Sequence, residues 1–205
     1  MDDVKHKVFI SYYDAEDHWY KDRLLNMNKV QEIFQDYSVH DNDIDDKGLT
    51  DERVREIIRD DFIKDATVLI LLCGLNTKKR KFIDWELKAA MFDSEKNPKL
   101  GILVINLPGV DNMVRAAGSE EKDLIGSEIP WQPVSHDRIT LENRFPYMPS
   151  RIIDNFVDGV PISVVNWNRI EDNGVILMKL IDIANNRKGS CTYNNSAPLW
   201  GRNRK

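Results

Sequence analysis

The residue whose type and position point most directly to chemistry is Glu86, in the segment KFIDWELKAAMF at residues 81–92. The apolar spacing predicts a helix, and at about 100° per residue Glu86 lies within the apolar arc around Phe82. The opposite, solvated face is expected to hold Lys81, Asp84 and Lys88. A carboxylate buried without a partner costs several kcal/mol, so Glu86 is expected to be paired, hydrogen-bonded or catalytic. The alternative is a Glu at the helix edge that reaches past Trp85 to water.

Several motifs that would indicate another chemistry are missing. The sequence has no G-x-G-x-x-G, no G-x-x-x-x-G-K-[ST] and no G-x-S-x-G, which argues against a Rossmann dinucleotide site, a P-loop and a nucleophile elbow. The central strand ends in Cys73-Gly74, where a receiver domain would need a phosphoacceptor Asp. His6, His18, His40 and His136 show no ligand spacing, so we expect no metal.

An acidic loop at residues 41–48 comes closest to a cation site. Asp41, Asp43, Asp45 and Glu52 match positions 1, 3, 5 and 12 of a calcium-binding loop. Position 6 should be Gly but is Asp46, and the preceding residues resemble a strand rather than a helix. We therefore favour a solvated acidic loop, which as a functional element would be a mobile cover over a nearby pocket.

Composition narrows the classes of partner. The chain has 205 residues and a net charge of −5, which argues against non-specific binding to nucleic acid or an anionic membrane. The longest apolar run, residues 66–75, is about half the length needed to span a bilayer. Cys73 and Cys191 lie far apart, unlike a disulfide framework, and the acidic N-terminus does not resemble a signal peptide. Together these features predict a cytoplasmic protein without membrane or nucleic-acid partners.

The elements that must position Glu86 follow from the hydrophobic pattern. Strands are predicted in the apolar runs at residues 7–12, 66–73, 100–106 and 161–167, with a weaker candidate at 38–40. Helices are predicted from residue 14 onward, after a cap at Thr50, across Glu86, and between Ile170 and Ala184. Alternating strands and helices predict an α/β fold of flavodoxin-like type, a parallel sheet of about five strands with helices on both faces.

We predict one domain over residues 1–187. Residues 107–149 carry five prolines and no clean period, and we expect a long irregular insertion there, with a helical turn at 150–156 after it. Residues 188–205 are expected to form an exposed C-terminal tail with a disordered basic end. Ligands bind beyond the carboxyl ends of parallel strands, so residues 11–14, 41–48 and 74–78 should share one rim with the loop after Asn106. Glu86 lies about two turns into the helix that leaves this rim.

The order of these parts resembles a TIR-like domain, and within that class the TIR-like sensor proteins of bacterial Thoeris anti-phage defence. Val8-Phe9-Ile10-Ser11-Tyr12, followed by Asp17, is similar to the family's opening strand and first helix. The stretch from Thr77 through Phe82 to Trp85-Glu86 is similar to its third-helix signature. Two departures concern substrate contacts: the acidic loop after the second strand, and Lys81 where many relatives carry Ser or Thr.

The resemblance implies cleavage of NAD at the nicotinamide–ribose bond, with NAD as substrate and no further cofactor. It implies closure of ADP-ribose into a cyclic isomer that activates a partner effector during phage infection. Glu86 would stabilise the oxocarbenium-like ribose. Aromatic side chains from Phe9, Tyr12 or Trp85 would hold a flat ring and exclude water, which favours cyclisation over hydrolysis. Ser11 and Thr77 would be hydrogen-bonding residues of the rim.

Two other functions stay open at this point. Many TIR domains act without catalysis, through contacts between copies, so self-assembly is a further expectation, and Glu86 would then be a member of a structural ion pair. A third reading is an unrelated flavodoxin-like nucleotide binder or hydrolase that uses a metal, although a phosphate-cradling glycine loop is missing. Each candidate site residue also has a purely structural explanation. The aromatic residues would belong to the core, Ser11 would end a strand, and Thr77 would cap a helix.

Overall fold

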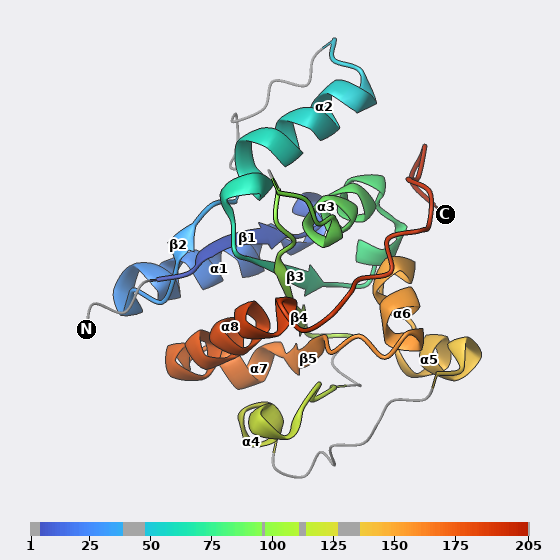
Figure 1. Ribbon diagram of the computed structural model, residues 1–205. Helices are drawn as coiled ribbons and strands as arrows, with labels where there is room; N and C mark the ends of the chain where they lie inside the picture. Colours follow the sequence, from blue (N-terminus) through green and yellow to red (C-terminus); the bar gives the residue numbers. More distant parts are fainter. Residues whose placement is uncertain (1–4, 39–47, 96, 111–113, 127–135, 205) are drawn as a thin grey trace.

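The structure is a computed structural model that describes residues 5–38, 48–95, 97–110, 114–126 and 136–204. Its centre is a parallel sheet with the strand order β2-β1-β3-β4-β5 (Figure 1). The strands are β1 (Lys7–Ser11), β2 (Gln35–Asp36), β3 (Val68–Cys73), β4 (Gly101–Asn106) and β5 (Ser163–Asn166). The predicted α/β, flavodoxin-like class with about five strands is confirmed.

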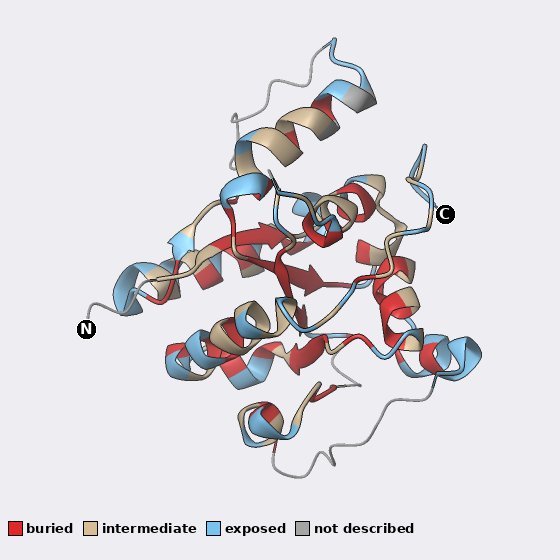
Figure 2. Ribbon diagram, in the orientation of Figure 1, coloured by how far each residue is buried: buried red, intermediate tan, exposed pale blue. Residues whose placement is uncertain are grey.

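The central strands are buried on both faces, as their continuous apolar sequences predict. Every residue of β3 and β4 is buried (Figure 2). Alternate side chains point to opposite faces, so Phe9, Leu69 and Leu71 lie in one core, and Ile10, Ile70 and Leu72 in the other. Ser11 continues the first series, which directs its hydroxyl to the same face as Phe9.

Two layers of helices cover the sheet. The helices are α1 (Asp14–Gln31), α2 (Asp51–Ile57), α3 (Lys81–Met91), α4 (Lys122–Ile125), α5 (Arg138–Arg144), α6 (Ser150–Val157), α7 (Trp167–Ile170) and α8 (Gly174–Lys188). Residues of α3 and α6 pack into the core that contains Phe9, and residues of α1 and α8 into the core that contains Ile10. Within the described residues, no helix is both long and apolar enough to cross a bilayer.

The second strand of the described sheet is the two-residue edge strand β2, Gln35–Asp36. Of the strand candidate at residues 38–40, Ser38 is not part of a strand, and residues 39 and 40 lie outside the described residues. Helix α1 ends at Gln31, and Glu32 adopts a left-handed conformation (φ 51°), so the apolar pair at 33–34 belongs to the turn. Ser38 instead accepts a hydrogen bond from the Ile10 backbone at 2.9 Å. The acidic residues 41–47 lie outside the described residues, so the expectations for that loop stay predictions.

The segment after β4 is irregular, as expected, but its described parts are anchored. It contains a 3₁₀ turn at Ser119–Glu121, helix α4 and helix α5. An isolated antiparallel bridge joins Arg115 to Val164 of β5. The turn predicted at residues 150–156 is a full helix, α6.

The C-terminal segment, residues 190–204, differs in part from the exposed tail that the sequence predicts for 188–205, because residues 201–204 are exposed but most of 193–200 is at least partly covered. It runs beside α3 and α6 (Figure 1), where Tyr193 is buried and donates its hydroxyl to the Leu100 carbonyl oxygen at 2.9 Å. Further along, the Arg204 backbone N–H donates to the Lys79 carbonyl at 2.8 Å. The expectation fails for the covered residues because polar residues such as Asn195 satisfy backbone and side-chain groups of α3, a non-local role that hydropathy does not reveal.

Candidate functional site: Glu86 at the tip of the first strand

Glu86 faces the carboxyl end of the sheet rather than open solvent. The Ser11 hydroxyl, at the last residue of β1, donates to Glu86 Oε2 at 2.6 Å. Helix α3 begins after the loop that follows β3, and β3 is the neighbour of β1 in the sheet. The helical periodicity that placed Glu86 on the inner arc therefore brings its carboxylate to the strand tips, where ligands bind in open α/β sheets.

The carboxylate of Glu86 is poorly hydrated, and no described residue supplies a cation to offset the lost hydration. The Glu86 side chain keeps partial access to solvent, but surrounding protein removes much of its hydration. This desolvation raises the pKa of Glu86 to about 7, and the hydrogen bond from Ser11 acts in the opposite direction. Among the described residues, no Lys, Arg or His forms an ion pair with it. A carboxyl group that titrates near neutrality is typical of functional sites.

The other acidic residue of α3 was misplaced by sequence reasoning. Asp84, predicted on the solvated face, is buried and paired with the guanidinium of Arg151 from α6. Arg151 Nε and Nη2 lie 3.0 and 2.8 Å from Asp84 Oδ1, and the Trp200 backbone N–H donates to Oδ2 at 3.1 Å. The prediction is wrong because the C-terminal segment covers this face of the helix.

The C-terminal segment also holds the rest of that face. Lys88 Nζ donates to the carbonyl oxygens of Asn195 (3.2 Å) and Ala197 (2.9 Å). At the start of the helix, the Lys81 backbone N–H donates to Asn203 Oδ1 at 2.9 Å, which satisfies one of the unpaired donors of the first turn. Helix α3 is thus fixed between the sheet and the C-terminal segment, and Glu86 with it.

The three aromatic residues predicted to touch substrate each make packing or hydrogen-bond contacts within the fold. Phe9 is buried in the sheet core, and Tyr12 packs on the α1 face, where its hydroxyl donates to Asp14 at 3.1 Å. Trp85 is buried, and its Nε1 donates to the Trp200 carbonyl at 2.9 Å. These contacts give each of the three residues a structural role, and their contact with substrate stays a prediction.

Thr77 supports the loop after β3 from a buried position. Its hydroxyl accepts a hydrogen bond from the Gly74 backbone at 2.8 Å and lies 3.4 Å from Asp17 Oδ2. A Cβ on Gly74 would lie 2.6 Å from Asp17 Oδ1, so only glycine allows this approach. Thr77 therefore positions the rim, and Ser11, among the predicted site residues, is hydrogen-bonded to Glu86.

Sequence reasoning missed two features of the rim. Asp17 is buried, and desolvation, with a smaller effect from nearby Glu16, raises its pKa to about 6. Arg80, which precedes α3, stacks its guanidinium 3.7 Å from the ring centre of Tyr13, in the loop after β1. Asp17 can be recognised in the sequence as an acidic residue in the first turn of a predicted helix. The sequence does not show that the end of β3 packs against it. The Arg80–Tyr13 stack has no local signal.

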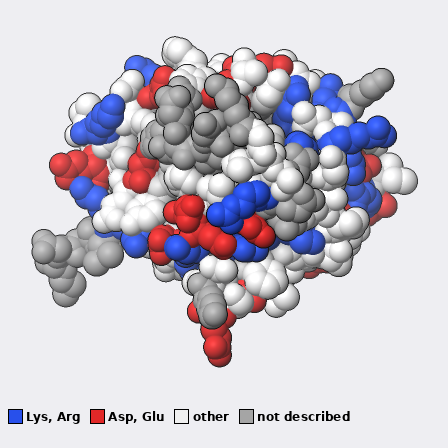
Figure 3. Space-filling model, turned by 90° about the horizontal axis from the view of Figure 1, so that it is seen from above, with Lys and Arg blue, Asp and Glu red and all other residues white. Residues whose placement is uncertain are grey.

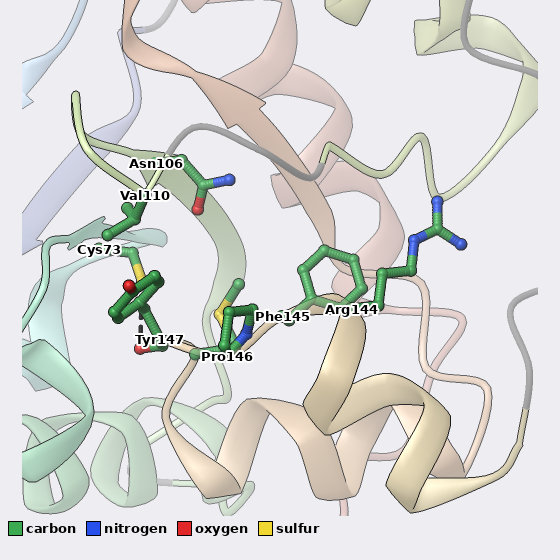
Figure 4. A pocket seen from close by; sticks show the side chains of 8 residues that line it. Cys73, Asn106, Val110, Arg144, Phe145, Pro146 and Tyr147 are labelled. Atoms are coloured by element: carbon green, nitrogen blue, oxygen red, sulfur yellow. Dashed lines mark hydrogen bonds between the residues drawn. The ribbon is translucent and has the colours of Figure 1, made fainter.

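A small hollow lies at the tips of β3 and β4 (Figure 4). It is lined by Cys73, Asn106, Val110, Arg144, Phe145, Pro146, Tyr147 and Met148. Its volume of about 20 Å³ leaves room for roughly one water molecule. Burial raises the pKa of Cys73 to about 12, so its thiol is not a nucleophile at neutral pH. Among the described residues, no group of three His, Cys, Asp or Glu side chains is arranged to hold a metal ion.

A five-stranded parallel sheet in this order defines a flavodoxin-like α/β fold, in which Glu86, on the helix after the central strand, is hydrogen-bonded to the end of the first strand. The model of the family described as "Thoeris protein ThsB, TIR-like domain" matches residues 9–112, and the chain belongs to this family. The matched range contains Ser11, Asp17, Thr77 and Glu86, whereas β5, α5, α6, α8 and the C-terminal segment follow it. No curated protein matches the chain.

Proposed function

We propose that this protein cleaves NAD at the bond between nicotinamide and ribose, with Glu86 as the catalytic carboxylate. When the glycosidic bond breaks, its electron pair leaves with nicotinamide and the ribose carbon becomes positively charged. A carboxylate beside that carbon stabilises the charge and binds the ribose hydroxyls. The observation that carries the proposal is the partly accessible, unneutralised Glu86 carboxylate, held by Ser11 at the strand tip of a Thoeris-type TIR-like domain.

The electrostatics of the site suit a cationic substrate. Nicotinamide in NAD carries a positive charge, and a cation placed beside Glu86 lowers its pKa below the value of about 7 in the empty site. Substrate binding therefore generates the carboxylate that the transition state needs. The same charge complementarity is missing for the nicotinamide product, which is neutral and leaves readily.

The proposed product is a cyclic isomer of ADP-ribose. The low hydration around Glu86 favours attack by a nucleophile within the bound ADP-ribose over attack by water, and the attacking atom then loses a proton. Within a Thoeris-type system we propose that this product activates a partner effector during phage infection. Self-assembly of the domain belongs to the same proposal, as the step that switches basal activity on.

The experiment that tests the proposal is mass analysis of the small molecules formed from NAD in cells challenged with phage. Wild type should release nicotinamide and accumulate an ADP-ribose isomer, and Glu86→Gln should do neither. Glu95→Gln, at an exposed position, is the matched control and should behave as wild type. Wild-type and Glu86→Gln proteins that both protect cells without forming these products would indicate a non-catalytic interaction module instead. A Glu86→Gln protein that forms the same products as wild type would show that Glu86 is not the catalytic carboxylate.

A further inference from the structure

A groove with basic walls lies where the C-terminal segment meets the loop before α3. It is lined by Lys78, Lys79, Glu142, Phe145, Pro146, Met148, Ser150, Ile153, Trp200 and Arg204. Its volume of about 380 Å³ falls within the range of roughly 300–1,000 Å³ that is usual for small-molecule sites. The floor is apolar, with Met148 and Ile153, and the cationic side chains come from two segments far apart in sequence.

The C-terminal segment builds one wall of this groove. The Arg204 backbone N–H donates to the Lys79 carbonyl at 2.8 Å, which holds the two basic residues side by side. The Arg204 guanidinium stacks 3.7 Å from the ring centre of Trp200, and this stack limits the directions in which it can point. Lys78 Nζ donates to the Pro146 carbonyl, which uses one of its three donors.

The charges in the groove are unbalanced. Lys78, Lys79 and Arg204 contribute three positive charges, and among the described residues no carboxylate forms an ion pair with them. The one acidic lining residue, Glu142, is bonded to Arg138 at 2.7 Å. Figure 3 shows Lys and Arg side chains gathered on the side of the molecule where the C-terminus lies in Figure 1. A cationic wall on a chain with net charge −5 indicates recognition of an anion.

We propose that this groove binds the diphosphate of a nucleotide. Lys78, Lys79 and Arg204 would contact the phosphate oxygens, because ammonium and guanidinium donors match phosphate in charge and geometry. The apolar floor would pack against the attached sugar and base. Glu86 lies five residues after Lys81, the first residue of α3, which corresponds to roughly 7.5 Å along the helix axis. Lys78 and Lys79 lie just before α3, the helix that carries Glu86, so in this proposal a dinucleotide held in the groove would extend from there to Glu86.

The identification of the nucleotide as NAD rests on the proposed function, whereas diphosphate binding does not. We would therefore titrate wild type with ADP, which lacks nicotinamide, and with adenosine, which lacks phosphate, by calorimetry. Lys79→Glu and Arg204→Glu should bind ADP about tenfold or more weakly, because a repelling charge replaces an attracting one. Lys179→Glu, at an exposed position of α8, carries the same charge change and should bind as wild type.

Two controls separate a loss of charge in the groove from misfolding and from a change in side-chain size. Thermal unfolding is measured for each variant, and Lys79→Gln, which removes the charge with little change in length, should weaken ADP in the same direction. The proposal is overturned if wild type does not bind millimolar ADP, if adenosine binds as tightly, or if the groove variants match Lys179→Glu. ADP binding that persists in Glu86→Gln without any nicotinamide release from NAD by wild type would support the groove and reject the proposed reaction.

Discussion

Asp84 and Glu86 lie two residues apart on helix α3, and the molecule treats their carboxylates in opposite ways. Asp84 is buried against the Arg151 guanidinium and receives a further hydrogen bond from the Trp200 backbone. Among the described residues, Ser11 donates a hydrogen bond to Glu86, and desolvation raises the pKa of Glu86 to about 7. The difference shows two uses of a carboxylate on one helix. Asp84 joins the helix to α6 and the C-terminal segment, whereas the carboxylate of Glu86 is left able to interact with a cationic ligand.

The largest effect on stability should come from breaking the Asp84 pair. Arg151→Met leaves Asp84 buried without its cation, which should lower the free energy of unfolding by about 3–5 kcal/mol. Denaturant unfolding measures this change. The matched control is Arg138→Met, which breaks the surface pairs of the half-exposed Arg138 with Glu142 and Asp154 and should cost about 1 kcal/mol or less. Equal losses in the two variants would show that Asp84–Arg151 is not the stronger connection.

Removal of the C-terminal segment should have a similar but smaller effect. Deleting residues 190–205 takes away the carbonyl acceptors of Arg151 at Ala197 and Pro198 and exposes the buried pair to water. We expect a loss of about 2–4 kcal/mol, from unsatisfied donors and lost packing. Thermal unfolding and nicotinamide release are measured together, with Ser196→Ala as the control at an exposed position. A deletion that leaves both unchanged would mean that α3 is positioned by the sheet alone.

Removing the charge of Glu86 should stabilise the fold, the opposite of the effect of breaking the Asp84 pair. The folded-state pKa of Glu86 is raised from 4.5 to about 7, so the folded protein binds more protons than the unfolded chain between these values, and stability falls as the pH rises through them. At pH 8, Glu86→Gln should therefore be more stable than wild type, by about 1–2 kcal/mol after allowance for the partial exposure of the carboxylate. At pH 4 the difference should vanish. Unfolding curves at both pH values give the comparison, and a destabilised Glu86→Gln at pH 8 would contradict it.

The smallest expected effect is that of Ser11 on the pKa of Glu86. The Ser11 hydroxyl stabilises the ionised form of Glu86, so Ser11→Ala should raise the pKa of Glu86 further, by about one unit. If catalysis needs the carboxylate, kcat/KM for NAD should rise with pH through about 7 in wild type, and the midpoint should lie higher in Ser11→Ala. An unshifted pH profile would remove Ser11 from the site.

The contrast between the two carboxylates also marks what the sequence can predict. Four strands follow from continuous apolar runs, and the inward position of Glu86 follows from helical periodicity, because both are local patterns. Periodicity predicts a solvent-exposed Asp84, because a local pattern does not show that a polar segment about a hundred residues later folds back over the helix. The short β2 has no apolar alternation, and the burial of Phe9 and Trp85 depends on neighbours that local patterns do not show. Substrate contact by Phe9, Tyr12 and Trp85 stays a prediction.

The most direct test of the central claim is the rate of nicotinamide release from NAD by purified protein in its activated, phage-triggered state. Wild type and Asp84→Asn that remains folded should both release nicotinamide, because only Glu86 faces the reacting ribose. Glu86→Gln should be slower by about 100-fold or more, while its unfolding shows an intact fold. Nicotinamide release by Glu86→Gln at the wild-type rate, or none by wild type in any state, would show that Glu86 is not a catalytic carboxylate.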